Sequence, residues 1–151
     1  MSFQEKNITV SLVNFCLILG YFLIRLFLMI QEGSFLPANV FRLWGIIIVL
    51  AVVVTIFATI LTHIVSAIIQ AIKTGEENPK VEDIEDERDR LIDLRGTKIT
   101  YFFHSIGVLL SMLTFVLGQP PLVMFTLLIL SGVVAQIIGD ISRLYLYRRG
   151  F

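Results

Sequence analysis

Four long apolar stretches, almost free of charged residues, constrain this chain more than any other feature of its sequence. They lie at about residues 8–30, 41–72, 99–117 and 122–147, and a helix needs about 20 apolar residues to cross a bilayer. Only 16% of the residues are charged, against about 25% in a typical soluble domain. We therefore predict an all-α membrane protein, a single domain over residues 1–151 in which four transmembrane helices form an antiparallel bundle.

The connections on one side of the predicted bundle are short. Residues 31–39 contain the helix breakers Gly33 and Pro37, and Gly118-Gln119-Pro120-Pro121 predicts a tight turn. The second apolar stretch is longer than a crossing requires, with about 45 Å of helix against a hydrocarbon core of about 30 Å. We expect this helix to tilt, to extend out of the membrane, or both.

Residues 73–98 form the one strongly polar segment inside the chain. Its first part reads as a loop, and its second part has the pattern of a helix with acidic residues first and basic residues last, as the helix dipole favours. We predict a short cytoplasmic helix between spans two and three, joined to the third span by a hinge at Gly96. Its charged side chains are candidates for docking a partner: Asp86, Arg88, Asp89, Arg90 and Arg95.

The distribution of basic residues predicts the orientation of the chain. Only Arg42 clearly falls on the side away from the termini, whereas ten lysines and arginines fall on the side of both termini and the polar segment: Lys6, Lys73, Lys80, Arg88, Arg90, Arg95, Lys98, Arg143, Arg148 and Arg149. Basic residues accumulate on the cytoplasmic side of membrane proteins. Both termini and the polar segment are therefore predicted to be cytoplasmic.

Small and polar residues recur at helical spacing in each apolar stretch. Gly107 and Ser111 are examples in the third stretch, and Gly132, Gln136 and Gly139 in the fourth. Small residues allow membrane helices to approach closely, and polar side chains form hydrogen bonds between them. These residues are expected to face the inside of the bundle.

Several ionisable or polar residues are predicted to share one layer nearer the cytoplasmic side: Asn14, His63, His104, Asp140 and Arg143. One interpretation is a structural network in which Asp140 is neutralised by Arg143 or by a histidine. The alternative is a site for proton or cation transfer in which His63, His104 and Asp140 titrate. The two histidines and Asp140 come from separate helices without the local spacing of a metal motif. No metal or other cofactor is predicted.

Arg25 is a cation inside the first apolar stretch, about five residues from its outer end. Glu32 follows seven residues later on the same helical face. We expect the Arg25 side chain to extend towards the outer surface of the membrane. Anion binding is the alternative.

The segment DERDRLIDLRG at residues 86–96, which runs into an apolar span, resembles a stretch shared by small predicted membrane proteins of bacteria and archaea. These proteins form a family whose domain has no known function. The resemblance covers the C-terminal half best. It implies a prokaryotic plasma (inner) membrane as the location and the topology described above, and it implies no catalytic residue.

The motifs in the chain exclude several classes of function. No phosphate-binding glycine loop, nucleophile elbow or zinc-protease pair is present, so we predict no enzymatic activity. The net charge of zero gives no reason to expect nucleic-acid binding. The leading hypothesis is a membrane protein that acts by association, as a homo-oligomer or with a cytoplasmic protein partner. The alternatives are a small transporter or channel for protons or cations, and a membrane sensor coupled to a cytoplasmic regulator.

Overall fold

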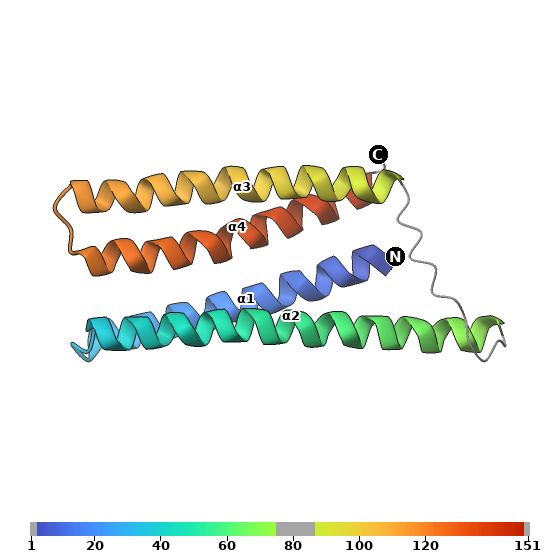
Figure 1. The fold of residues 1–151 in the computed structure, drawn as a ribbon, viewed down its shortest axis with the longest axis horizontal. Helices are drawn as coiled ribbons and strands as arrows, with labels where there is room; N and C mark the ends of the chain where they lie inside the picture. The colour runs from blue at the N-terminus through green and yellow to red at the C-terminus, as the bar shows by residue number, and fades with distance from the viewer. Residues whose placement is uncertain (1–2, 75–86, 150–151) are drawn as a thin grey trace.

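The structure is a computed structural model that describes residues 3–74 and 87–149. In this part the chain is all-α, with four helices, α1 (Phe3–Gln31), α2 (Pro37–Thr74), α3 (Glu87–Val116) and α4 (Pro121–Arg149). They run up and down so that both termini lie at one end, here called the terminal end (Figure 1). The four helices are long and apolar enough to cross a membrane. The predicted all-α architecture with four helices of membrane-spanning length and composition is confirmed, and it indicates an integral membrane protein.

Glycine and proline define the two short turns at the far end, opposite the terminal end. Gly33 and Gly118 have φ angles of 65° and 84°, the left-handed conformation that ends helices at little cost for glycine. Beyond each glycine, a backbone N–H reaches five residues back, from Ser34 to the Met29 carbonyl (2.9 Å) and from Gln119 to the Thr114 carbonyl (3.1 Å). The next helices then begin at Pro37 and Pro121, where the missing N–H of proline costs no hydrogen bond.

Helix α4 contacts each of the other three helices, most extensively α3, then α1, and only slightly α2. The central apolar cluster joins three helices, through Ile18, Phe22 and Met29 of α1, Leu43 and Ile47 of α2, and Val133 of α4. Helix α2 therefore packs mainly on α1. Its buried side chains in the described part, Val40, Leu43 and Ile47, all lie near its start.

Glycines bring α3 and α4 together along their length. A Cβ atom at Gly107 would overlap the side chain of Ser131, and one at Gly139 would overlap the side chain of Thr100. Only residues without a side chain allow backbones to approach this closely. The prediction that small residues face the inside of the bundle is confirmed at Gly107 and Gly139.

The predicted separate helix between spans two and three is not observed in the described part of the chain. Helix α3 runs without interruption from Glu87 to Val116, so Gly96 lies within a continuous helix and is no hinge. No proline or turn sequence separates residues 87–98 from the apolar span, so the hydrogen-bond ladder continues through both. Residues 75–86, the start of the predicted segment, lie outside the described residues.

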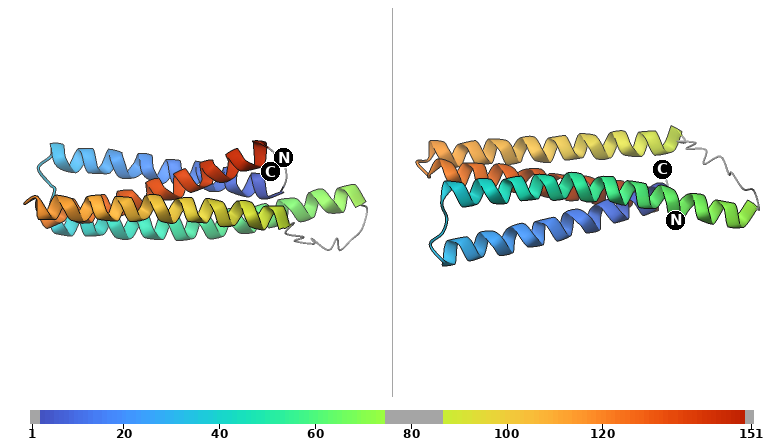
Figure 2. Two further views of the ribbon diagram at one scale, coloured as in Figure 1. Left: turned by 90° about the horizontal axis from the view of Figure 1, so that it is seen from above. Right: turned by 60° about the horizontal axis from the view of Figure 1, so that its bottom comes forward.

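The second helix is longer than the predicted stretch of residues 41–72, because it begins at Pro37 and ends at Thr74. Helix α2 has 38 residues, whereas α1, α3 and α4 have 29, 30 and 29. Its length is about 57 Å at 1.5 Å per residue. Both views in Figure 2 show α2 running past the other helices at the terminal end.

Candidate functional site

A buried carboxylate in α4, Asp140, is the centre of a polar cluster near the terminal end. Its residue is only 2% exposed. Ser11 of α1 donates a hydrogen bond to Oδ2 (2.6 Å), and Gln136 and Arg143 donate to Oδ1 (3.2 and 3.1 Å). A buried charge is costly unless it is paired and hydrogen-bonded. These three donors, which include one cation, meet that requirement.

Arg143 connects this carboxylate to the third helix. Its Nε donates to Oδ1 of Asp93 (2.9 Å) and its Nη2 donates to Oγ1 of Thr97 (2.8 Å), while Nη1 pairs with Asp140. The aliphatic part of the side chain passes over Gly96, where a Cβ atom would overlap Arg143 Cγ. Charge-assisted hydrogen bonds of this kind are the strong ones. One guanidinium group therefore joins α3 to α4, and through Asp140 and Ser11 to α1.

A cavity of about 250 Å³ lies beside this cluster, and residues of all four helices line it. Asp140, Arg143 and Asp93 contribute one positive and two negative charges to its wall. Its other lining residues are mostly polar: Asn7, Ile8, Val10, Ser11, Asn14, Thr55, Thr59 and Gln136. The net charge of the wall is −1. Such a wall offers amide and carboxylate oxygens to a cation or to water.

The structure brings some of the predicted layer together. Asn14, Asp140 and Arg143 line the same cavity, and the predicted pairing of Asp140 with Arg143 is present at 3.1 Å. His63 lies in α2, but its side chain is outside the described residues. Its part in the predicted layer stays a prediction.

His104 lies apart from this cluster. Its ring approaches Gly132 of α4, where a Cβ atom would be 3.9 Å from Cε1. Gly132 precedes Asp140 by eight residues, or about 12 Å along the helix. The Nδ1 atom of His104 is buried, and in the described part of the chain it has no hydrogen-bond partner. Within those residues, no group of three or more His, Cys, Asp or Glu side chains could hold a metal ion.

The predicted docking residues divide into two groups. Two are engaged with α4, because Asp89 accepts a hydrogen bond from the Tyr147 hydroxyl (2.8 Å) and Arg88 donates one to the Tyr147 carbonyl (3.3 Å). Arg90 and Arg95 are exposed. Asp86 lies outside the described residues.

Asp93 and Thr97 are the members of the cluster that the sequence did not single out. They stand at i and i+4 on one face of α3, and that spacing was the available signal. The signal was hard to recognise because both residues lie in a segment rich in charge, which predicts a separate cytoplasmic helix. Their partner, Arg143, lies about 50 residues away in the sequence.

Comparisons with known proteins add no relative. Neither the scan against family models nor the searches of curated proteins and of solved structures found a match to this chain.

Proposed function

We propose that this integral membrane protein acts by association, and that it pairs with a second copy of itself through α2. The observation that supports the proposal is a stripe of exposed isoleucines along the second half of that helix. Ile56, Ile60, Ile64 and Ile68 follow one another at intervals of four residues, and each is 51–53% exposed. We call them the isoleucine stripe.

The depth of the isoleucine stripe makes it unusual. Thr59 lines the same cavity as Asp93 and Arg143, so the part of α2 beyond Thr59 lies farther out than these charged groups. At that depth α3 is strongly charged, whereas α2 carries no Asp, Glu, Lys or Arg from Ile56 to Ile72. Exposure of apolar side chains to water is unfavourable by about 25 cal/mol per Å². The stripe is therefore expected to be covered.

A second copy of the chain is the occupant that fits these side chains best. The stripe contains no charge, so its pairing with itself buries no ion. Two copies inserted in the same direction are related by an axis along the membrane normal, and each isoleucine then meets its counterpart at the same depth. Apolar residues at a four-residue spacing form a continuous seam along a helix.

The mass of the purified protein in detergent tests this association. We expect the wild type to have twice the chain mass of 17.1 kDa. The double variant Ile60→Glu, Ile64→Glu is expected to be monomeric, because each carboxylate would face its counterpart in the seam and like charges repel. The matched control is Leu91→Glu, Leu94→Glu at exposed positions of α3 near the terminal end, which we expect to remain dimeric. A monomeric wild type, or a double variant that stays dimeric, would contradict the proposal.

The proposed location is the inner membrane of a prokaryote, with the terminal end in the cytoplasm. Three arginines near the C-terminus, Arg143, Arg148 and Arg149, support this orientation together with the basic residues at the start of α3. The exposed Arg90 then faces the cytoplasm, where a protein partner can reach it. A reporter enzyme that is active only in the periplasm, fused to the C-terminus, tests the orientation. We expect this fusion to be inactive, and an active fusion would place the terminal end in the periplasm.

The cavity beside Asp140 supports a second candidate function, transfer of a monovalent cation. Its wall has a net charge of −1 and amide oxygens from α1. If the protein conducts cations, proteoliposomes should show a cation flux, and Asp140→Asn should reduce that flux about tenfold or more. The variant removes the negative charge that compensates the cation for its lost hydration. The same flux in vesicles without protein, or an unchanged flux in the variant, would exclude this candidate.

A further inference from the structure

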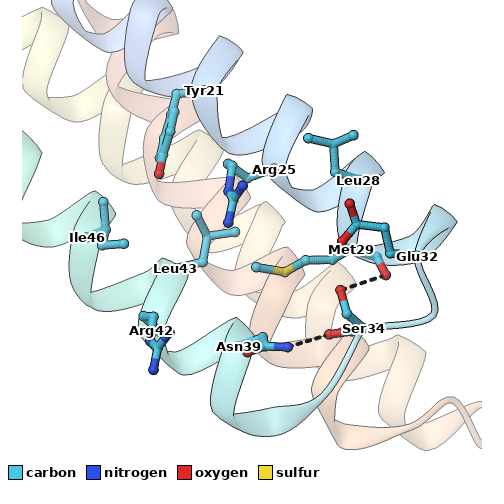
Figure 3. Close-up of a pocket in the computed structure, with 10 residues that line it drawn as sticks. All are labelled: Tyr21, Arg25, Leu28, Met29, Glu32, Ser34, Asn39, Arg42, Leu43 and Ile46. Carbon is cyan, nitrogen blue, oxygen red and sulfur yellow. Dashed lines mark hydrogen bonds between the residues drawn. The ribbon is translucent and has the colours of Figure 1, made fainter.

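A second cavity lies at the far end of the molecule, beside the turn that joins α1 to α2 (Figure 3). Its volume is about 260 Å³. The side chains that line it come from both helices and from the turn: Tyr21, Arg25, Leu28, Met29, Glu32, Ser34, Asn39, Arg42, Leu43 and Ile46. It shares no lining residue with the cavity beside Asp140.

Two arginines on opposite helices contribute to this cavity. Arg25 lies six residues before the end of α1, and Arg42 lies five residues after the start of α2. Among the described residues, neither of these two guanidinium groups forms an ion pair with an acidic group within 4.0 Å. An arginine in a membrane helix is costly unless its charge is compensated. Both cations are thus available to an anion from outside the chain.

The remaining polar groups order the turn and set the net charge of the cavity. The turn is held in place by hydrogen bonds from Asn39 Nδ2 to the Ser34 carbonyl (2.9 Å) and from Ser34 Oγ to the Met29 carbonyl (3.4 Å). Tyr21 precedes Arg25 by one helical turn and adds a hydroxyl group. With Glu32 included, the wall keeps a net charge of +1, which favours an anion over a cation.

The position of the cavity matches the depth of lipid headgroups. Phe41 and Trp44, which flank Arg42, are 48% and 45% exposed. Aromatic residues of this kind are enriched where the hydrocarbon meets the headgroups. The phosphates of the lipids lie at that level.

We propose that this cavity binds a phosphate group between Arg25 and Arg42. Guanidinium groups form paired hydrogen bonds with phosphate oxygens, which gives arginine its preference for this anion. The Tyr21 hydroxyl donates a further hydrogen bond. The phosphate group could be the phosphodiester of a lipid headgroup or inorganic phosphate, and the two sources share the chemistry that the arginines recognise.

Native mass spectrometry of the detergent-solubilised protein with added phosphatidylglycerol tests binding of the lipid. We expect the double variant Arg25→Gln, Arg42→Gln to lose about tenfold or more of the affinity, since hydrogen bonds to charged groups contribute strongly. Glu32→Gln should bind this anionic lipid more tightly than the wild type. Arg148→Gln is the control, because it removes an exposed arginine at the terminal end, and its affinity should be unchanged.

A parallel titration with inorganic phosphate, read out as a shift in melting temperature, separates the two sources of the phosphate group. Binding of the lipid alone assigns a headgroup site, and binding of inorganic phosphate alone assigns a site for a soluble phosphate. Both results support the proposal if the double variant abolishes them. The variant Arg25→Lys, Arg42→Lys keeps both charges and should bind more weakly than the wild type but more tightly than the glutamine variant. The proposal would be overturned if the wild type bound neither the lipid nor inorganic phosphate. Equal losses of affinity in Arg148→Gln and in the double variant Arg25→Gln, Arg42→Gln would also overturn it.

Discussion

Helices α2 and α4 are both apolar over most of their length, yet they are used in different ways. Helix α4 contacts all three other helices and buries residues from Thr126 to Asp140. Helix α2 buries only residues near its start, among those described, and exposes an isoleucine at every fourth position farther along. The comparison shows that hydropathy identifies a membrane helix but does not show whether its partner lies in the same chain.

The largest effect is expected where α4 carries its ion pair. Arg143→Gln would leave the buried Asp140 without a cation, and removal of one member of a buried pair costs about 3 kcal/mol or more. We expect a strongly lowered melting temperature in detergent, measured by the loss of helical circular dichroism. Arg148→Gln at an exposed position should melt like the wild type. Equal melting of the two variants would show that the cluster does not hold the helices together.

The close approach of α3 to α4 should give the next largest effect. Gly107→Ala places a methyl group against Ser131, and such overpacking costs about 1–3 kcal/mol. The matched control is Gly45→Ala in α2, where a Cβ atom meets nothing within 4 Å. This control should be neutral or slightly stabilising, because alanine is the better helix former. If both variants had the same melting temperature, the close approach of α3 to α4 at Gly107 would not contribute to stability.

The sequence predicts much of the fold but little of this difference between helices. The four apolar stretches and the turns at Gly33 and Gly118 follow from local patterns, because hydropathy and backbone conformation are properties of short segments. The sequence does not predict which helices pack against each other. Helices α2 and α4 are apolar on most faces, so the periodicity of apolar residues does not identify the face that is buried.

The candidate site shows the same limit. Asp140 and Arg143 could be paired from their spacing of three residues, whereas their contacts with Ser11 and Asp93 depend on how helices far apart in the sequence pack together. The continuity of α3 through Gly96 also required the structure, since a glycine within a helix and a glycine at a hinge look alike in sequence. There the absent side chain makes room for Arg143.

The smallest effect on the single chain is expected in the isoleucine stripe. Ile64→Ala should change the stability of the monomer by about 0.5 kcal/mol or less, as at other exposed positions. Val133→Ala in α4 removes part of a buried side chain that is 7% exposed, and it should cost about 1 kcal/mol or more. Denaturation at a protein concentration low enough to keep the chain monomeric measures both. A large loss for Ile64→Ala under that condition would mean that the stripe packs within one chain.

Disulfide crosslinking in the membrane tests the association of α2 most directly. Cys16, the one native cysteine, is first replaced by serine, and single cysteines are then introduced at Ile60, Ile64 and, as a control, at the exposed Leu109 of α3. A disulfide requires Cα atoms about 4.4–6.8 Å apart, so only residues that meet their counterparts in a second copy will react readily. We predict that mild oxidation converts Ile60→Cys and Ile64→Cys into covalent dimers and leaves Leu109→Cys monomeric. Crosslinking of the α2 variants no greater than that of Leu109→Cys would contradict the account.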